Sequence, residues 1–265
     1  MPLIFPGLVL TAPPDQPAWL PRIGIHDVFR SGTVTASSTA DGFPALNVTN
    51  GLTYDWWRST GQAEEWIAVE LDEAATCDYF AVAAHSLAGS EVTPQYHDGS
   101  TWQNAAAPLV PADSQCLMWV FPPTVSRRWR LRVRNSGTPV SVGVIYCGQA
   151  HVVPVGLPIG FAPPGFNERT KYETLRSVAG NSLGATVVSE GVEADFQFRY
   201  LPEAWVRTEW YRLQAELKRH PCFIAWSDKR GAGDVVFGYA SRDPSASYSS
   251  HDRMDVRLLI DGVVK

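Results

Sequence analysis

Short runs in which apolar and polar residues alternate dominate the first half of the chain. In residues 64–72, EEWIAVELD, the apolar side chains of Ile67, Val69 and Leu71 alternate with polar or small ones, which predicts a strand with these three turned toward a core. RRWRLRVRN at 127–135 alternates in the same way, whereas YFAVAAHS at 79–86 is a nearly continuous apolar strand, and SVGVIYCG at 141–148 is the last strand of the set. Turn-forming residues separate such runs at intervals of about 8–12 positions, which is typical of an all-β sandwich or barrel.

The pattern changes after the proline-rich segment 150–166. In GATVVSEGVEADFQFRY, residues 184–200, the apolar side chains from Val192 to Tyr200 alternate with charged or polar ones. This pattern predicts a hairpin with its turn at Glu190–Gly191.

One helix is predicted at residues 203–219, between a proline in its first turn and Pro221, which stops it. Its apolar stripe consists of Val206, Trp210, Leu213 and Leu217. The aromatic residues that we expect to make assembly contacts on this helix are Trp205, Trp210 and Tyr211.

The predicted fold class is therefore mainly β, with a jelly-roll-like sandwich followed by a second β-sandwich that has one flanking α-helix. The expected divisions are a Pro-rich N-terminal arm at 1–27, a first sandwich at 28–149, a Pro-rich linker at 150–166 and a second β domain at 167–265.

Composition narrows the function classes. The net charge is -5, and the arginines of 127–135 alternate with core residues as on one solvated strand face, so we expect no nucleic-acid partner. The four cysteines have no zinc spacing and indicate buried thiols in a reducing compartment.

The proline-broken apolar start predicts neither a signal peptide nor a membrane span, and the sequon Asn47–Thr49 is then expected to stay unmodified.

Catalytic motifs find little support. GNSLG at 180–184 matches the nucleophile elbow of a hydrolase, but a strand rather than a helix is predicted after Ser182. The six histidines show no metal-ligand spacing, and the pair Glu64–Glu65 is interpreted as solvated charge at a strand edge. We expect the protein not to be an enzyme.

Residues 28–149 resemble the discoidin, or coagulation-factor C-type, domain. The motifs that carry the resemblance are Ala36-Ser37-Ser38, the run from Pro44 to Gly51, Thr53 with Trp57, Trp66 to Leu71, YHDGSTWQNAA at 96–106, and RRWRLRVRN at 127–135. The resemblance implies a jelly roll without chemistry of its own that presents loops to glycans, lipids or protein partners.

It also assigns roles at the loop end. Trp57 is implied to be buried, which leaves Tyr54, Asp55 and Trp56 as candidate ligand-binding residues. Trp56 has the alternative role of covering the sandwich edge. Some members of the family hold calcium through the aspartate of an Asp-Gly turn, where this chain has Asn50. An amide is a poorer ligand for this cation than a carboxylate, so at most a weak calcium site is expected near Asn50, and no other cofactor.

Residues 176–264 resemble tail proteins of long-tailed bacteriophages, in which a β-sandwich with one helix forms a ring that continues the tail tube. The resemblance implies a distal-tail-like structural protein of the virion, placed at the tail tip or baseplate and assembled in the bacterial cytoplasm. It would form a homo-oligomeric ring, with the discoidin-like module facing host-surface glycan or neighbouring baseplate proteins. The alternative is a stand-alone carbohydrate-binding module or lectin.

Overall fold

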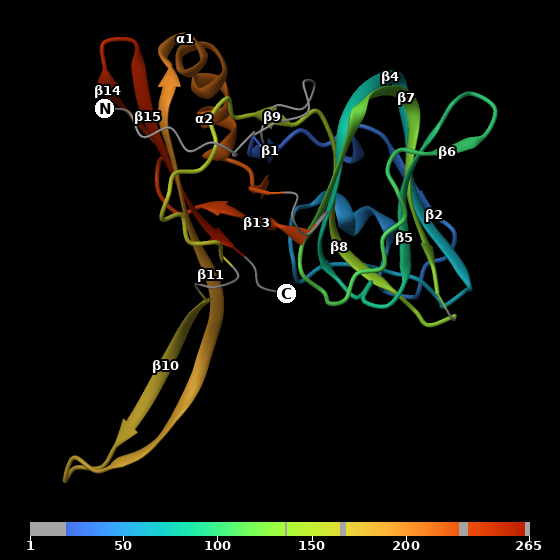
Figure 1. The fold of residues 1–265 in the computed structure, drawn as a ribbon. Helices are drawn as coiled ribbons and strands as arrows, with labels where there is room; N and C mark the ends of the chain where they lie inside the picture. Colours follow the sequence, from blue (N-terminus) through green and yellow to red (C-terminus); the bar gives the residue numbers. More distant parts are fainter. Residues whose placement is uncertain (1–19, 136, 165–167, 228–232, 263–265) are drawn as a thin grey trace, which may run out of the picture.

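The protein has two β lobes. The computed structural model describes residues 20–135, 137–164, 168–227 and 233–262. The N-terminal lobe is built on a seven-stranded sheet, and the C-terminal lobe on an eight-stranded sheet with one helical segment (Figure 1). The predicted mainly β fold class is thus confirmed. No helix within the described ranges is long and apolar enough to cross a membrane.

The N-terminal lobe is a jelly-roll-like sandwich. Its elements are η1 (Val28–Arg30), β2 (Thr33–Ala36), η2 (Ala45–Thr49), β3 (Trp57–Arg58), β4 (Glu64–His85), β5 (Glu91–His97), β6 (Trp102–Asn104), β7 (Leu117–Arg134) and β8 (Ser141–Gly148). The strand order is β3-β8-β4-β7-β5-β6, and β2 pairs with β4. The β4–β7 register shifts between Glu70 and Ala75, so the first part of β4 pairs with β2 and its second part with β8. The long strand β4 therefore has different partners along its length, β2 at its start and β8 at its end, and pairs with β7 in both parts.

The core of this lobe follows the alternation in the sequence. Ile67, Val69 and Leu71 are buried as predicted. Trp57 and Trp129 are fully buried in the same cluster, and the indole N–H of Trp57 donates to the Ser38 carbonyl at 2.9 Å. The predicted burial of Trp57 is confirmed.

Glu65 corrects the prediction of a solvated carboxylate pair. Its side chain is buried and accepts hydrogen bonds from the hydroxyls of Ser37 and Ser38 and the backbone N–H groups of Gly61 and Gln62. Burial alone would raise the pKa of Glu65, but these hydrogen bonds outweigh it and hold the pKa below its ordinary value. The serine pair of the sequence motif thus ties the first loop to β4.

The C-terminal lobe packs a helical segment on its sheet. Its elements are β1 (Arg22–Gly24), β9 (His151–Val152), β10 (Glu168–Arg176), β11 (Ser182–Pro202), α1 (Glu203–Trp205), η4 (Val206–Trp210), α2 (Tyr211–Leu217), β12 (Cys222–Ala225), β13 (Val235–Ala240), β14 (Ser245–Ser250) and β15 (Arg253–Gly262). The order is β10-β11-β15-β13-β12-β1-β9, and β14 pairs with β15. The buried side chains of the helical segment are the predicted stripe Val206, Trp210, Leu213 and Leu217.

Two short strands come from outside the expected second domain. β1 lies in the segment that the sequence placed in an N-terminal arm, and β9 lies in the expected linker. They pair with each other, and β1 also pairs with β12. The chain therefore enters the C-terminal lobe before it builds the N-terminal one.

The predicted turn at Glu190–Gly191 is wrong. Both residues lie inside β11, where they pair with Thr170 and Arg169 of β10. The chain reverses at residues 177–181, where Gly180 has a φ of 84° that glycine adopts at little cost. The glycine of a Glu-Gly pair is compatible with a strand, and the pairing of β10 with β11 overrides the local turn signal.

The two lobes share an apolar junction. Tyr146 of β8 packs against Phe223 of β12 and Phe237 of β13, with ring centroids 5.3 and 5.9 Å apart. The two phenylalanine rings are 4.6 Å apart. A Cβ on Gly24 would lie 2.6 Å from the Tyr79 ring, so this glycine allows β1 to approach β4. The two lobes therefore share one buried apolar cluster at the junction.

Candidate functional site

The loop before β3 carries the residues predicted to bind a ligand. The side chain of Tyr54 is 72% exposed, whereas Trp56 is half-buried and stacks on Phe43 with centroids 6.1 Å apart and planes at 9°. The guanidinium carbon of Arg58 lies 5.9 Å from the centre of the Phe43 ring. Trp56 thus forms an aromatic pair with Phe43 and keeps part of its surface open, so the ligand-binding role and the edge-covering role both remain predictions.

The third residue, Asp55, is held by two amides. Asn47 Nδ2 donates to one carboxylate oxygen at 3.3 Å, and Asn50 Nδ2 donates to the other at 3.1 Å. The Asn50 side-chain oxygen accepts from the Leu52 N–H at 2.7 Å. The carboxylate is therefore oriented by the loop.

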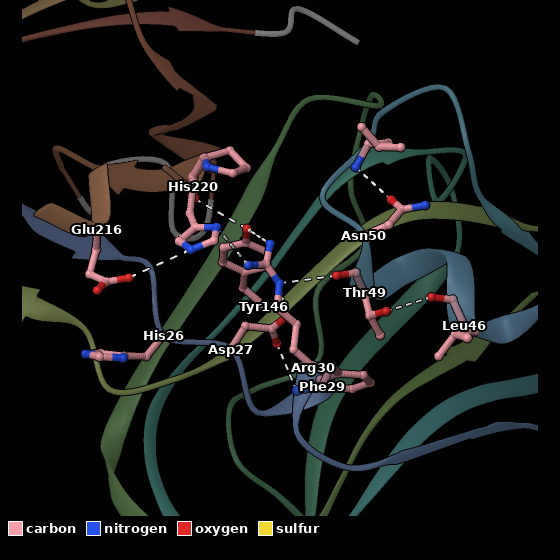
Figure 2. A network of polar contacts seen from close by, with 12 residues as sticks. His26, Asp27, Phe29, Arg30, Leu46, Thr49, Asn50, Tyr146, Glu216 and His220 are labelled. Atoms are coloured by element: carbon pink, nitrogen blue, oxygen red, sulfur yellow. Dashed lines mark hydrogen bonds and ion pairs between the residues drawn. The ribbon is translucent and has the colours of Figure 1, made fainter. Parts of the chain in front are cut away.

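A polar network around Arg30 links this loop to the C-terminal lobe. Its guanidinium donates to the Thr49 carbonyl at 3.2 Å and to the Tyr146 hydroxyl at 2.5 Å, and it lies 3.4 Å from His220 Nδ1 (Figure 2). Thr49 and Tyr146 belong to the N-terminal lobe, while His220 follows α2. No local sequence motif indicated this network, because its members come from distant parts of the chain.

The groups near Asn50 that could act as calcium ligands are already engaged within the protein. Arg30 already places a positive charge at the Thr49 carbonyl, and the Asn50 amide is used within its own loop. Among the residues with described positions, no group of three or more His, Cys, Asp or Glu side chains could hold a metal ion.

Calcium is expected to leave thermal stability unchanged. The cation would compete with Arg30 for the Thr49 carbonyl and would find an amide where a carboxylate is preferred. The measurement is the melting temperature in millimolar calcium and in chelator. A saturable rise with calcium would contradict this expectation.

Asp27 makes the stability of the junction depend on pH. Its side chain is 1% exposed; one oxygen accepts from the Phe29 N–H, and the other lies 3.5 Å from Arg30 Nε without a hydrogen bond. Burial raises the pKa of Asp27 from 3.8 to about 7, against the opposing effects of the Phe29 N–H, Arg30 and the backbone N–H of Cys147. Because the folded state favours the protonated acid, this stability contribution is complete below the unfolded pKa and is lost as pH rises through about 7.

Asp27→Asn is expected to remove this dependence while it keeps the acceptor for the Phe29 N–H. Relative to the variant, the wild-type protein should lose up to ~1.4 kcal/mol of unfolding free energy per pH unit as the pH rises from the unfolded pKa of 3.8 to the folded pKa of about 7. Urea unfolding of both proteins at about pH 5 and about pH 8 measures the difference. A difference that stays constant with pH would argue against a buried acid that titrates here.

The β10–β11 ribbon projects from the body of the molecule and forms the second candidate site, which we call the arm (Figure 1). Residues 182–191 of β11 pair with β10, and β15 joins β11 only from Val192 onward. The exposed apolar side chains of the arm are Tyr172, Leu175, Val178, Leu183, Val187 and Val188. The sequence did not identify the arm, because the wrongly placed turn shortened it.

The helix offers less surface than predicted. Trp210 is 1% exposed in the core beneath the helical segment, and Trp205 is partly buried beside it with ring centroids 6.4 Å apart. Tyr211 is 73% exposed. The expected contact role of Trp210 is therefore corrected to a core role, because its helical position faces the sheet, and Tyr211 remains accessible.

A pocket of about 780 Å³ opens where the arm meets the sheet. It is lined by residues 158–162 and by polar side chains of β11 and β15. Arg257 holds Asp195 with two hydrogen bonds of 2.9 and 2.8 Å, and Gln197 donates to the same carboxylate at 3.1 Å. Arg257 thus balances the charge of Asp195 at the base of the arm.

The serine of the GNSLG motif lies at the start of a strand. Ser182 is the first residue of β11, and Gly180 and Gly184 both have positive φ values in the arm. A nucleophile elbow needs a helix directly after the serine, so this arrangement does not form one.

Comparisons with known proteins find similarity in structure. No model of a known protein family matches the sequence, and no curated protein matches it. Chitosan-binding module 1 of a chitosanase/glucanase from Paenibacillus sp. IK-5 is 22% identical, with a TM-score of 0.41 over 46% of this chain and 98% of the module. The lectin domain of lectinolysin, solved with Lewis B antigen, is 15% identical, with a TM-score of 0.41 over 48% of this chain and 99% of that domain. A family 32 carbohydrate-binding module from C. perfringens, solved with galactose, is 13% identical, with a TM-score of 0.41 over 48% and 98%.

Proposed function

We propose that this protein is a non-catalytic structural component that assembles with copies of itself, and that the arm supplies the contact. The single observation that carries the proposal is an exposed two-stranded ribbon with apolar side chains. A ribbon of this kind is marginally stable in water on its own, and unpaired strand edges recruit further strands.

Each face of the arm carries exposed apolar side chains among polar ones. Tyr172 pairs directly with Val187, so their side chains share one face, and Leu175 lies on the opposite face because it is three positions further along the strand from Tyr172. These side chains are 62%, 46% and 56% exposed. Neighbouring copies that pack on the arm would cover both faces, and repeated head-to-tail contacts form a ring when the rotation between copies closes.

The assembly that we propose is the tail tip or baseplate of a long-tailed bacteriophage. Support comes from the resemblance of residues 176–264 to tail proteins and from the helix-covered sheet that bears the arm. The N-terminal lobe would face outward, toward a host surface or a neighbouring baseplate protein, and the particle would be assembled in the bacterial cytoplasm.

Antibody labelling of phage particles tests this assignment. Particles are collected from the bacterial culture that carries the gene and are labelled with an antibody to the purified protein. Label at one end of the tail is the expected result. Particles without label, or with label along the tail shaft, would rule out a tail-tip position.

The second candidate is carbohydrate binding at the loop before β3. It is favoured by the stacked pair of Trp56 and Phe43 beside an oriented carboxylate, since sugars pack apolar ring faces on aromatic side chains and offer hydroxyls to planar polar groups. Trp56→Ala should then abolish binding on a glycan array, while Tyr211→Ala, which removes an exposed aromatic from the other lobe, should not. Equal binding by both variants would reject this candidate.

A further inference from the structure

The arginines of β7 form a second surface on the N-terminal lobe. β2, β5 and β6 lie on the side of this lobe that is turned away from the C-terminal lobe (Figure 1). Between β4 and β5, strand β7 turns Trp129, Leu131 and Val133 into the core, so Arg130 and Arg132 point outward. We call this surface, made by Arg128, Arg130 and Arg132 with Trp66, Gln95 and Trp102, the arginine face.

Arg130 is held in place without a carboxylate. Its guanidinium carbon lies 4.3 Å from the centre of the Trp102 ring, and its Nε donates to Gln95 Oε1 at 2.7 Å. Gln95 is itself fixed, because it is buried and donates to Asn104 Oδ1 at 2.7 Å. The guanidinium therefore keeps N–H donors that none of these contacts uses.

Four arginines, Arg128, Arg130, Arg132 and Arg134, alternate with core residues along β7, and the carboxylates on the neighbouring strands are Glu64, Glu70 and Glu91. Arg134 pairs with Glu64 at 2.7 Å, and Arg132 lies 3.6 Å from Glu91. Within the described part of the chain, neither Arg128 nor Arg130 forms an ion pair. Burial lowers the pKa of Arg130, and the neighbouring Arg132 adds to this effect against the attraction of Glu64.

Arg132 adds an unsatisfied donor. Its Nε is buried and has no hydrogen-bond partner, while its side chain is 14% exposed. The Nη2 of Arg132 lies 3.5 Å from Thr93 Oγ1 and 3.6 Å from Glu91. An anion at the surface could accept from the Nη groups of Arg130 and Arg132 together, rather than from the buried Nε, and it would relieve the repulsion between two neighbouring cations.

An aromatic ring and a planar guanidinium on the same face indicate the kind of anion. Trp66 is the strand partner of Arg132 and is half-buried, so part of its ring remains open beside the guanidinium. A planar guanidinium matches the two oxygens of a carboxylate, and an aromatic ring packs against the apolar face of a sugar.

We propose that the arginine face binds a polysaccharide that carries carboxylates, that is, a chain containing uronic acid residues. This surface is separate from the loop before β3 and from the arm, so it does not rest on the assembly proposed above. The carboxylate would lie between Arg130 and Arg132, with a sugar ring against Trp66.

Titration calorimetry with polygalacturonate and with alginate tests the proposal. Wild-type protein should bind at least one of them, with weaker binding at high salt, and should not bind methyl-esterified polygalacturonate, which lacks the charge. Arg130→Gln should lower the affinity about tenfold, and Arg130→Gln with Arg132→Gln further, because charge-assisted hydrogen bonds to the carboxylate are lost.

Arg212→Gln is the matched control, since it removes an exposed arginine from α2 in the other lobe. Its affinity should equal that of the wild-type protein, and melting temperatures would show that all variants are folded. The proposal is overturned if neither polyuronate binds, if the Arg130 variants bind as well as the control, or if poly-glutamate binds as tightly, which would indicate an acidic protein partner.

Discussion

Replacing Phe237 by alanine is expected to lower the free energy of unfolding by ~3–5 kcal/mol, because it empties the centre of the junction between the lobes. The Phe237 side chain is 1% exposed, and its ring packs against Phe223 and Tyr146 from opposite lobes. The lobes cannot close the cavity without moving β13 against β8. Denaturant unfolding followed by tryptophan fluorescence measures the loss.

Tyr239→Ala is the matched control for this prediction. Tyr239 lies two residues further along β13 and is 47% exposed, so its removal should change stability by less than ~1 kcal/mol. Losses of similar size in both variants would mean that the junction does not contribute as a packed core.

Aspartates on the arm are expected to convert the assembled protein into monomers. Leu175→Asp with Val187→Asp places a charge on each face of the arm, where a second copy would otherwise bury apolar surface. Burying two unpaired carboxylates in such a contact costs several kcal/mol, which weakens association by a factor of roughly a thousand or more. Sedimentation velocity of the variant beside the wild-type protein measures the effect.

Val125→Asp controls for charge on an exposed aliphatic position. Val125 is 64% exposed on β7, in the other lobe, which is comparable to the exposure of the two arm residues. This variant should assemble like the wild-type protein. If Val125→Asp dissociated the protein as much as the two arm substitutions do, the arm would not be the self-assembly contact.

The periodic parts of the fold were predictable from the sequence. Ile67, Val69 and Leu71 are buried as their alternation required, and Trp210 and Leu213 face the core as the helical spacing required. Such patterns reflect a local geometry that repeats along one element, so a single sequence is enough to read them.

Contacts between distant segments were not predictable. Arg30 and His220 are 190 positions apart, and no spacing rule links them. Glu65 looked solvated next to Glu64, yet hydrogen bonds from Ser37 and Ser38 hold it in the interior. These positions depend on how the elements pack rather than on neighbouring residues.

The candidate sites were predicted only in part. The loop before β3 was named as a candidate because adjacent tryptophans in an extended segment must point to opposite sides and the resemblance implied that Trp57 is the buried one. The burial of Trp57 is confirmed, and the binding role stays a prediction. The arm was missed because Glu190–Gly191 resembles a turn, whereas β11 continues through it. The arginine face was taken as ordinary solvated surface, because a strand pattern does not show which cations lack a partner.

Sedimentation equilibrium of the wild-type protein over a wide concentration range tests self-assembly most directly. The account predicts one dominant species whose mass is a fixed multiple of the 29.1 kDa chain, as a closed ring requires. A 29.1 kDa monomer at every concentration would contradict it.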